Sequence, residues 1–471
     1  MVCIYLIENM GSMPKSFNVK SVAIVGAGPS GLCMAKYLRA QGSVQRIVIL
    51  EQQPDVGGVW KYTAIPSKQN PVPQEDPQYP HDGPVEIQGD GAPLYPSPMY
   101  EKLHANVPAP LMQFSDQPFP TEDRLFPKRE AIQAYLERYS ADVRHLIKFS
   151  YQVKKISRHD DGGRDKWTVE AQSTINKATL TDTFDAVVVA SGHYSVSFLP
   201  NVKNMKQFHE THPSVITHSK NYRKPDDFRD KKVVIVGNGP SGSDLAAQIS
   251  AASQRRPILS VRHATPPARL AHIRCEEIAE IDEFLVDTRG IRCKDGHVEN
   301  DLDAIIYCTG FLYSYPFLPD FQSQLITGGH GVHGLYKHLF LVQHPTLVFP
   351  GLNMKSTPWQ LSESQAAVIS AVWANQLDLP PVEEMQKWSR ELSEDLGDFP
   401  HVFKAGEDVR YINELHDWAI QAGFLGKEPP LWNEEMAWLR SLLLDVKMRF
   451  EELGCQAKTV EELGLEYKPS E

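Results

Sequence analysis

The stretch SVAIVGAGPSGLCMAKYLRAQG, residues 21–42, decides the fold of this 471-residue chain. Residues 22–25 form the kind of apolar run that is buried on both faces of a parallel sheet. Gly26, Gly28 and Gly31 then give a G-x-G-x-x-G turn that opens a helix, and Gly42 ends that helix. A second apolar run, IVILE at 47–51, predicts the next strand. The pattern is typical of a unit that binds a dinucleotide at the helix N-terminus.

The same unit recurs in KKVVIVGNGPSGSDLAAQIS, residues 231–250, where Gly237, Gly239 and Gly242 take the glycine places. A single G-x-G-x-x-G motif is weak evidence, because glycines cluster in many kinds of turn. Two copies that start 211 residues apart, each between an apolar strand and a helix, are stronger evidence. They indicate two dinucleotide-binding domains in one chain.

Another pair of similar segments indicates how the two domains are connected. FDAVVVASGH at 184–193 and LDAIIYCTGF at 302–311 each run from Asp-Ala through four strand-type residues to a small residue and glycine. Each predicts a late strand that returns to the dinucleotide edge of its own sheet. We therefore expect an α/β fold with two Rossmann-like domains: a first domain from residues 1–194 and 311–471, ending in helices, and a second domain, 195–310, inserted in it.

The residue twenty positions after the last glycine has opposite charge in the two copies. It is Glu51 in the first copy and Arg262 in the second. A carboxylate there accepts hydrogen bonds from both ribose hydroxyls and repels a 2′-phosphate, which suits FAD or NAD. A guanidinium offers a fork of donors to phosphate, which suits NADP. The contrast favours FAD in the first domain and NADPH in the second over the alternative that Glu51 is merely a solvated acid.

Composition limits the remaining function classes. A net charge of −11 argues against nucleic acid or an anionic membrane surface as a main partner. No apolar run approaches the roughly 18 residues of a membrane span, and the N-terminal VCIYLI lacks the flanks of a secretory signal. The C-terminal EYKPSE is neither a peroxisomal nor an ER address. Six cysteines without a C-x-x-C pair fit a reducing compartment, and we expect a cytoplasmic protein.

Two further regions differ from the nucleotide units. Residues 63–98 are rich in proline and glycine and predict an irregular surface loop. After residue 360 the apolar spacing becomes helical, and EEMAWLRSLLLDVKMRFEELG is expected to form a helix that packs on its own domain rather than on a membrane surface. The apolar faces of these helices leave homo-oligomerisation open.

Six segments together resemble one enzyme family. They are GAGPSG, GGVW at 57–60, SPMYEKLHANVP at 97–108, THSKNYR at 217–223, GNGPSG and YCTGF. In this order and spacing they resemble the flavin-containing monooxygenases, which are class B flavoprotein monooxygenases, and are most similar to the soluble fungal members. The resemblance runs from about residue 20 to 450 and implies FAD, NADPH and an N,N-dimethylaniline-monooxygenase-like activity.

The resemblance also implies roles for residues at matching positions. GGVW resembles the segment that covers the flavin ring system, so Gly58, Val59 and Trp60 are expected to contact FAD unless Trp60 is plain core. Asn106 would lie over the flavin, where its amide holds the reactive oxygen adduct or the nicotinamide, unless it is only a turn residue before Val-Pro. Tyr100 matches a tyrosine that lines the same cavity. Asn106 and Tyr100 are the candidate catalytic residues.

The candidate cofactor-binding residues come from the glycine turns, the strand ends and the matching motifs. They are Gly26, Gly28, Pro29, Ser30, Gly31, Glu51, Gly58, Val59, Trp60, Asn106, Val107, Ser191, Gly192, Ser219, Gly237, Gly239, Pro240, Ser241, Gly242, Arg262, Thr309, Gly310 and Gln365. No metal site is predicted, because HETH at 209–212 has no third ligand.

Two further motifs concern the hand-over of NADPH and a helix near the flavin. THSKNYR resembles the fingerprint F-x-G-x-x-x-H-S-x-x-Y-R, but His212 and Ser214 replace its Phe and Gly, which leaves the hand-over of NADPH less defined. His218 is expected to be structural rather than a general base. Ser362 and Gln365 have the spacing of a capping box, which predicts a helix that starts at Ser362 and faces the flavin unless it is an ordinary capped helix.

The resemblance implies NADPH-dependent monooxygenation. Hydride passes from NADPH to FAD, dioxygen adds at flavin C4a to give a hydroperoxide, and a sulfide, thiol or amine attacks its distal oxygen. Asn106 and NADP⁺ would shield the adduct from water. A disulfide reductase would need a redox-active cysteine pair. A Baeyer–Villiger oxygenase of ketones, an uncoupled NADPH oxidase and a non-catalytic FAD- and NADPH-binding protein remain as alternatives.

Overall fold

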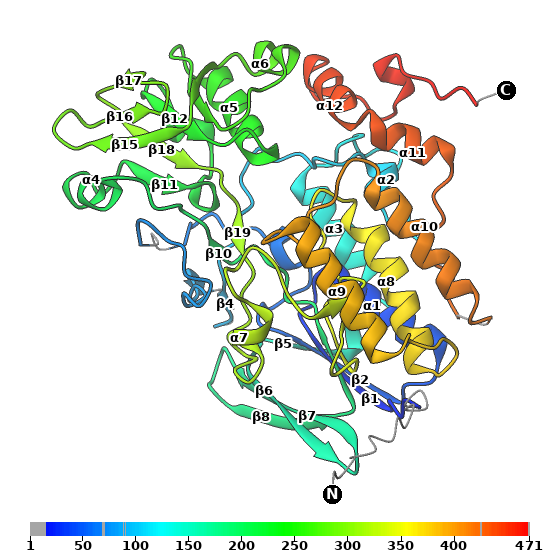
Figure 1. Ribbon diagram of the computed structural model, residues 1–471. Helices are drawn as coiled ribbons and strands as arrows, with labels where there is room; N and C mark the ends of the chain where they lie inside the picture. The colour runs from blue at the N-terminus through cyan, green and yellow to red at the C-terminus, as the bar shows by residue number, and fades with distance from the viewer. Residues whose placement is uncertain (1–15, 68–70, 88, 90, 424–425, 470–471) are drawn as a thin grey trace, which may run out of the picture.

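The computed structural model describes residues 16–67, 71–87, 89, 91–423 and 426–469, and Figure 1 shows two α/β lobes joined near the middle of the molecule. Each lobe is built on a sheet whose central strands are parallel. The predicted fold class is confirmed. The N-terminal VCIYLI and the last two residues of EYKPSE lie outside the described residues, so the predictions made for them are not examined by the structure.

A seven-stranded sheet in the order β20-β21-β22-β9-β1-β2-β5 forms the centre of the first lobe. Strand β1 pairs in parallel with β2 on one side and with β9 on the other, as a Rossmann-like sheet requires. The strands are β1 (Ser21–Val25), β2 (Arg46–Glu51), β5 (Ile147–Phe149), β9 (Ala186–Val189), β20 (Leu335–Tyr336), β21 (Phe340–Leu341) and β22 (Leu347–Val348). Val22, Ala23 and Ile24 have no exposed surface, so the apolar run at 22–25 is buried on both faces as predicted.

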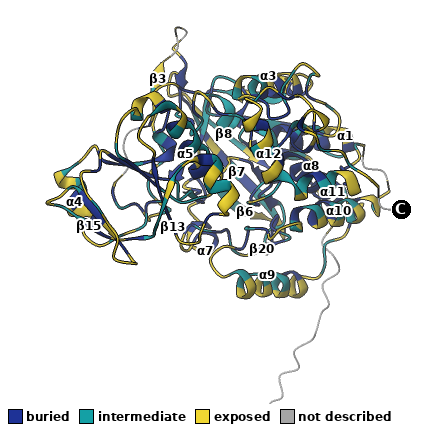
Figure 2. Cartoon of the chain, turned by 90° about the horizontal axis from the view of Figure 1, so that it is seen from above, coloured by how far each residue is buried: buried dark blue, intermediate teal, exposed yellow. Residues whose placement is uncertain are grey.

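Helices α1 (Pro29–Gln41) and α8 (Pro358–Trp373) pack together beside this sheet. Fifteen of the sixteen residues of α8 are buried, which makes it the central helix of the lobe, whereas α9 (Val382–Leu396) buries Met385 alone. Figure 2 shows this contrast in burial between α8 and α9. The other helices of the lobe are α2 (Ala109–Met112), α3 (Arg129–Tyr139), α7 (Gln322–Leu325) and α10 (Glu407–Ile420).

An antiparallel meander covers the lobe at its lower edge in Figure 1. Its strands are β6 (Tyr151–Asp161), β7 (Arg164–Ser173) and β8 (Thr179–Phe184). The described part of the Pro-rich segment 63–98 is mostly irregular, with two short strands, β3 (Glu86–Ile87) and β4 (Pro93–Leu94). It is not only a surface loop, because Val72 joins the core of the second lobe and Leu94 and Tyr95 are buried.

The second lobe contains a five-stranded parallel sheet in the order β11-β18-β12-β13-β14. Its strands are β11 (Ile216–His218), β12 (Val233–Val236), β13 (Ile258–Val261), β14 (Glu276–Ala279) and β18 (Ala304–Tyr307). The remaining elements are α4 (Met205–Thr211), α5 (Pro240–Ala252), α6 (Pro267–Ile273) and an antiparallel sheet of β15 (Ile281–Leu285), β16 (Gly290–Cys293) and β17 (Val298–Glu299). The sheet positions the second glycine turn between β12 and α5, as the sequence predicts.

Two very short strands connect the lobes. Strand β10 (Val196–Ser197) carries the chain from the first lobe to the second, and β19 (Phe311–Leu312) carries it back. They pair antiparallel, Val196 with Leu312 and Ser197 with Phe311. The chain therefore enters and leaves the second lobe at one place.

The predicted C-terminal helix is in fact two helices, α11 (Glu434–Ser441) and α12 (Leu443–Glu452), separated at Leu442. The prediction of one continuous helix is wrong. Val446 and Phe450 are fully buried in the core of the first lobe, which agrees with packing on the parent domain. Over the residues that the structure describes, no helix has the length and apolar character needed to cross a membrane.

Candidate functional site

The first glycine turn has the backbone shape that only glycine adopts easily. Gly26 has a φ of 100°, and a Cβ on it would lie 2.6 Å from the Ala190 carbonyl oxygen. A Cβ on Gly31 would lie 2.0 Å from the Gly26 carbonyl oxygen, so α1 can pack this closely only with glycine there. Gly28 is the N-cap of α1, and Pro29 and Ser30 form its first turn. The turn therefore presents the start of the helix to a bound anion.

The GGVW segment lies directly on this turn. Gly57 and Gly58 have φ values of 122° and 57°, and a Cβ on Gly58 would lie 3.1 Å from the Gly28 Cα atom. Residues 58–60 form a 3-10 turn in which Val59 accepts a hydrogen bond from the Ser97 hydroxyl. Trp60 is half-buried and packs against the cores of both lobes. The segment thus closes one side of the first turn.

Glu51 is the last residue of β2, and its side chain points into the first turn. It is 5 % exposed, and its two carboxylate oxygens accept hydrogen bonds from the backbone N–H groups of Ala27, at 2.7 Å, and Gln53, at 2.8 Å. Burial raises the pKa of Glu51, and these N–H donors oppose the shift. This is a fixed, buried carboxylate rather than a solvated acid at a strand end.

Helix α8 approaches the first turn, but it does not start where the capping-box pattern predicts. The helix begins at Pro358, and Ser362 lies inside it, donating its hydroxyl hydrogen bond to the Pro358 carbonyl at 2.8 Å. The capping-box prediction is wrong, because a proline at the first helical position starts the helix one turn earlier. Ser362 is also 2.9 Å from the Ser30 hydroxyl, which joins α8 to the start of α1.

Gln365 is buried and organises the loop before α8 rather than facing open space. Its Oε1 accepts from the Gly351 N–H at 2.8 Å, and its Nε2 donates to Asn353 and to the Tyr411 hydroxyl, each at 3.1 Å. A Cβ on Gly351 would lie 2.5 Å from the Ser30 hydroxyl. Gln365 thus holds this loop against the first turn.

The second turn repeats the geometry of the first but is open. Gly237 has a φ of 102°, and a Cβ on Gly242 would lie 1.9 Å from the Gly237 carbonyl oxygen. A Cβ on Gly239 would meet no heavy atom of the described chain within 4 Å. Pro240 and Ser241, the first residues of α5, are exposed. In the part of the chain that the structure describes, nothing comparable to Gly57 and Gly58 lies over this turn.

Arg262 follows β13 directly and is engaged by an acid. Its side chain is 66 % exposed, and its Nε lies 2.6 Å from one oxygen of Glu280. Lys294 binds the other oxygen of Glu280 at 2.5 Å. These two cations lower the pKa of Glu280, the hydrogen bond from Lys294 being the larger cause. A carboxylate therefore sits between two cations at the strand tip where the sequence predicts a phosphate.

The two candidate catalytic residues lie on one segment, in different surroundings. Asn106 is exposed, in the bend that precedes α2, and Val107 beside it is half-buried. Tyr100 is buried between the lobes, where its hydroxyl donates to the Asp244 carboxylate of α5 and its ring meets Tyr222 edge to face at 5.2 Å. The structure therefore places Tyr100 in the contact between the lobes, whereas Asn106 is free to meet a ligand.

The remaining predicted residues lie at the carboxyl ends of strands. Ser191 and Gly192 follow β9 and are exposed. Thr309 and Gly310 follow β18, and the Thr309 hydroxyl donates to the Phe198 carbonyl at 2.5 Å. Ser219 follows β11. Burial raises the pKa of the Cys308 thiol to about 12, and a hydrogen bond with Ser219 opposes that shift. Ligands of open α/β sheets bind at this edge.

His218 is buried, and its ring accepts a hydrogen bond from the Lys220 N–H at 3.1 Å. Burial, with Lys220 nearby, lowers the pKa of His218 to about 3. The ring is therefore neutral and held by the backbone, which suits the expected structural role.

Three buried polar residues near the first turn were not predicted. Asn353 and Thr357 lie in the loop before α8, and the Asn353 Nδ2 and Thr357 Oγ1 atoms are buried without a hydrogen-bond partner in the described structure. His193 follows Gly192, and both of its ring nitrogens are likewise buried without a hydrogen-bond partner in the described structure. The proline after Thr357 is the signal that could have indicated the true helix start.

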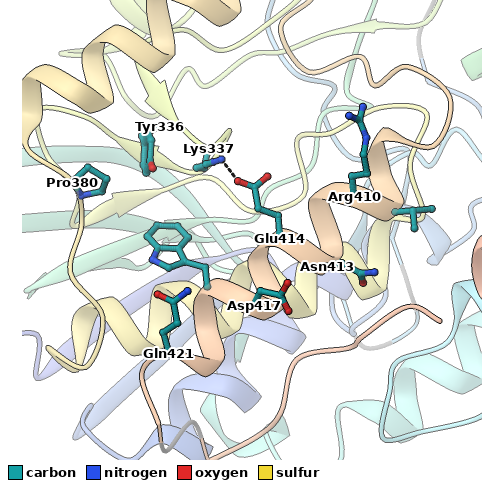
Figure 3. A pocket seen from close by; sticks show the side chains of 10 residues that line it. Tyr336, Lys337, Pro380, Arg410, Asn413, Glu414, Asp417 and Gln421 are labelled. Atoms are coloured by element: carbon teal, nitrogen blue, oxygen red, sulfur yellow. Dashed lines mark hydrogen bonds and ion pairs between the residues drawn. The ribbon is translucent and has the colours of Figure 1, made fainter. Parts of the chain in front are cut away.

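A hollow of about 690 Å³ lies away from both glycine turns, between α10 and the β20–β21 hairpin. Figure 3 shows Lys337 and Glu414 paired across it, with Arg410 and Asp417 on α10 nearby. None of the predicted cofactor-binding residues lines this hollow. The dinucleotide edges of the two sheets, rather than this hollow, are therefore the candidate site.

The residues at both turns fit dinucleotides. The first turn combines glycines that permit close approach of a pyrophosphate, a helix N-terminus, a buried carboxylate and unpartnered buried polar atoms, which suits a resident FAD. The second combines the same turn with open space and an arginine, which suits NADPH. Among the described residues no group of three or more His, Cys, Asp or Glu could hold a metal ion, and none was predicted.

Two such turns in one chain define a pyridine-nucleotide-dependent flavoprotein, and comparison with known proteins gives its family. A model of flavin-binding monooxygenase-like proteins matches residues 95–266 and 276–433, and an NAD(P)-binding Rossmann-like model matches residues 24–87. The chain belongs to the flavin-binding monooxygenase-like family. It is an NADPH-dependent flavin monooxygenase that uses FAD and NADPH, so the predicted family, enzyme class and cofactors are confirmed.

Individual relatives match over most of their length. The chain is 29% identical to the thiol-specific monooxygenase of Saccharomyces cerevisiae over 441 residues, which cover 90% of this chain and 91% of that protein. It is 31% identical to flavin-containing monooxygenase FMO GS-OX-like 2 of Arabidopsis thaliana over 395 residues, covering 80% and 78%. The solved structure of S-allyl-L-cysteine S-oxygenase from Allium sativum matches with a TM-score of 0.73 and 25% identity, covering 96% of this chain and 98% of that one.

Proposed function

We propose that the enzyme transfers one oxygen atom of dioxygen to a nucleophilic sulfur or nitrogen atom of a small molecule. The observation that carries the proposal is the nearly full-length likeness to a thiol-specific monooxygenase and to an S-oxygenase of an S-alkenyl cysteine. Sulfur is therefore the first atom to test.

Residues at the first glycine turn would bind FAD, and residues at the second would bind NADPH. Glu51 would accept the ribose hydroxyls of FAD, and the N–H groups at the start of α1 would bind its pyrophosphate. FAD held by these residues would supply the chemistry of hydride acceptance and dioxygen activation. The start of α8, with Thr357 and Asn353, would stabilise negative charge on the reduced ring.

Asn106 would act at the point of oxygen transfer. Its exposed amide can donate a hydrogen bond to the activated oxygen or to the nicotinamide, and so exclude water from the reacting atoms. Arg262 would exchange Glu280 for the 2′-phosphate of NADPH.

The proposal includes the organisation of the chain. We place the first domain at residues 1–194 and 311–471 and the inserted NADPH domain at 195–310; the pairing of β10 with β19 supports these limits. We also propose a cytoplasmic location, for which the free thiols of Cys33, Cys275, Cys293, Cys308 and Cys455 are support.

The experiment is product analysis with four substrates: a thioether, a thiol, a tertiary amine and a cyclic ketone, each with NADPH and dioxygen. We expect a sulfoxide or an oxidised thiol in nearly one-to-one ratio with NADPH consumed. Conversion of the ketone to a lactone, with no change in the thioether, would contradict the proposal. Consumption of NADPH that yields peroxide alone would do the same.

Asn106→Ala tests the placement of the proposed oxygen-transfer residue. Because a hydrogen bond to a developing charge contributes about 1.5–3 kcal/mol, product per NADPH should fall roughly 10-fold or more while bound FAD stays constant. Peroxide should rise by the amount of product lost. Asn201→Ala, at another exposed asparagine, is the matched control and should leave product unchanged. An Asn106→Ala enzyme with full product yield would refute the role.

A further inference from the structure

Helix α12 contacts both nucleotide domains. Its apolar side chains Val446 and Phe450 are buried in the core of the first domain, and Figure 1 shows its other side beside α6 of the NADPH domain. The His272 Nε2 of α6 is 2.7 Å from the Glu451 Oε2, and its Nδ1 is 3.6 Å from the Glu452 Oε1. The side chains of His272 and Glu451 are 13% and 23% exposed, so this contact is partly shielded from solvent.

Lys447, one turn before Glu451, connects the same helix to the segment that carries Asn106. Its Nζ donates to the Ala105 carbonyl oxygen at 2.9 Å and lies 3.6 Å from the Glu451 Oε1. The ammonium also lies over the rings of Phe126 and Phe450, at 4.8 and 5.8 Å from their centroids. The Lys447 side chain is only 14% exposed, and its ammonium points toward Ala105, the residue before Asn106.

The Asn106 segment is fixed at a second point by the NADPH domain itself. Tyr100 donates to Asp244 of α5, and Asp244 also accepts from Gln248 at 3.1 Å. Burial raises the pKa of Asp244, and the Lys447 ammonium opposes that shift. Residues 97–106 are therefore held to α5 at one end and to α12 at the other.

We propose that Lys447 and Glu451 are positioning residues for oxygenation, which join the NADPH domain, through His272, to the peptide that carries Asn106. The proposal rests on the role proposed for Asn106. Its physical basis is that β10 and β19, two residues each, give the lobes a narrow covalent connection. The contact of His272 with Glu451, outside that connection, would limit rotation of the NADPH domain relative to the flavin. A hydrogen bond to an ammonium group is stronger than one between neutral groups, and removing one partner of a partly buried charge pair leaves the other charge uncompensated.

The test uses the FAD-loaded full chain and three measurements: bound FAD, the KM for NADPH, and product against peroxide per NADPH with a thioether. Lys447→Met keeps the packed stem and removes the charge. We expect full FAD content, product per NADPH lowered roughly 5- to 20-fold and a matching rise in peroxide. Lys447→Arg should restore most of the coupling. Asp445→Asn, an exposed acid on the same helix, should change nothing.

Glu451→Gln and His272→Gln test the link to the NADPH domain. Each should raise the KM for NADPH roughly 3- to 10-fold with little change in kcat, and the double variant should be no worse than either single one. Additive effects of the two substitutions on the KM for NADPH, or an unchanged KM in both single variants, would show that His272 and Glu451 do not link the domains. If Lys447→Met fails to bind FAD, product against peroxide per NADPH in Glu451→Gln decides the positioning role, and unchanged coupling in that variant would overturn it.

The possible results distinguish the positioning role of Lys447 and Glu451 from the oxygen-transfer role of Asn106. Unchanged coupling in Lys447→Met, together with product loss in Asn106→Ala, would overturn the positioning role and leave Asn106 in place. Full product yield in Asn106→Ala would exclude Asn106 from oxygen transfer. Non-additive effects of His272→Gln and Glu451→Gln on the KM for NADPH would still support a contact between the domains at these two residues.

Discussion

The two glycine turns have the same backbone and different surroundings. Gly26 and Gly237 have φ values of 100° and 102°, and the contacts that exclude a Cβ at Gly31 and Gly242 are 2.0 and 1.9 Å. The first turn is covered by Gly57, Gly58 and the loop held by Gln365, whereas Gly239 faces open space. Glu51 is 5% exposed and the Arg262 side chain is 66% exposed.

The difference is what we expect if one nucleotide stays bound and the other exchanges. A closed turn with a buried carboxylate suits a cofactor that remains bound through many reactions, because release would require its covering segments to open. An open turn with a solvated arginine suits a nucleotide that must enter and leave once in each cycle. On the assignment we propose, the same local sequence motif would serve a prosthetic group in one domain and a co-substrate in the other.

The largest expected effect comes from alanine at the buried glycine of each turn. Overpacking of this kind costs about 1–3 kcal/mol or more. Gly31→Ala should lower bound FAD and activity by roughly 100-fold. Gly242→Ala should keep FAD and lower the rate of flavin reduction by NADPH by a similar factor. Visible absorbance and stopped-flow reduction measure the two effects.

Dithionite supplies the control for the glycine pair, since it reduces flavin without a nucleotide site. The Gly242→Ala enzyme should be reduced by dithionite at the normal rate. Loss of FAD from Gly242→Ala, with normal FAD in Gly31→Ala, would reverse the assignment of the turns.

Arg262→Ala should weaken NADPH far more than NADH. An arginine–phosphate pair of about 1.5–3 kcal/mol predicts a KM for NADPH raised roughly 10- to 100-fold. Steady-state kinetics with both nucleotides measures the ratio. Arg255→Ala, at an exposed arginine of the same domain, is the matched control. Equal losses for NADPH and NADH would remove Arg262 from the phosphate site.

Buried histidines at strand ends should make both domains less stable in acid. Burial lowers the pKa of His193 to about 4, and burial with Lys220 nearby lowers that of His218 to about 3, from an ordinary value of 6.5. Below pH 6.5 the unfolded chain therefore binds more protons than the folded chain, and stability falls as pH falls toward 4. At pH 5 the loss should be about 2 kcal/mol for each histidine.

Thermal unfolding at saturating FAD between pH 7.5 and 5 measures this acid sensitivity. His218→Gln should flatten the pH dependence of Tm, because glutamine does not titrate. A variant with the same fall in Tm as the natural chain would show that His218 is not a source of the acid sensitivity.

Glu280→Gln should have the smallest effect, in the opposite direction from Arg262→Ala. The amide removes the carboxylate that competes for Arg262 and Lys294. An exposed pair is worth about 0.2–1 kcal/mol, so the KM for NADPH should fall roughly 2- to 3-fold while that for NADH stays constant. A raised KM for NADPH would show that Glu280 helps to hold Arg262 in its binding position.

Much of the fold could be predicted because glycines report backbone shape directly. A Cβ has no room at Gly26, Gly31 or Gly242. Gly237 has a φ of 102°, which favours glycine. The spacing of these four glycines therefore identifies the turns without further information. The opposite charges of Glu51 and Arg262 can likewise be recognised from the local sequence, because each residue stands at a fixed distance from its glycine turn, at the end of the following strand. The roles of Asn106 and Tyr100, which came from resemblance, stay predictions.

What could not be predicted depends on contacts between distant residues. Gln365 was expected near a helix start and instead supports Gly351 and Asn353, because Pro358 starts α8 earlier. The pairing of Arg262 with Glu280 joins two strand ends of the same domain, and no local pattern shows it. The division at Leu442 leaves the apolar spacing of the C-terminal helices unchanged, so periodicity alone could not show it.

The pairing of β10 with β19 has a consequence for synthesis on the ribosome. The strands of the second lobe's parallel sheet, β11 to β18, follow one another in sequence and can pair as soon as the last of them emerges. Strand β9, in contrast, must wait for β22, about 160 residues later, to complete its sheet. Pairing over so long a separation is slow. The first lobe is therefore the later of the two to complete its sheet, after the second lobe has had time to form.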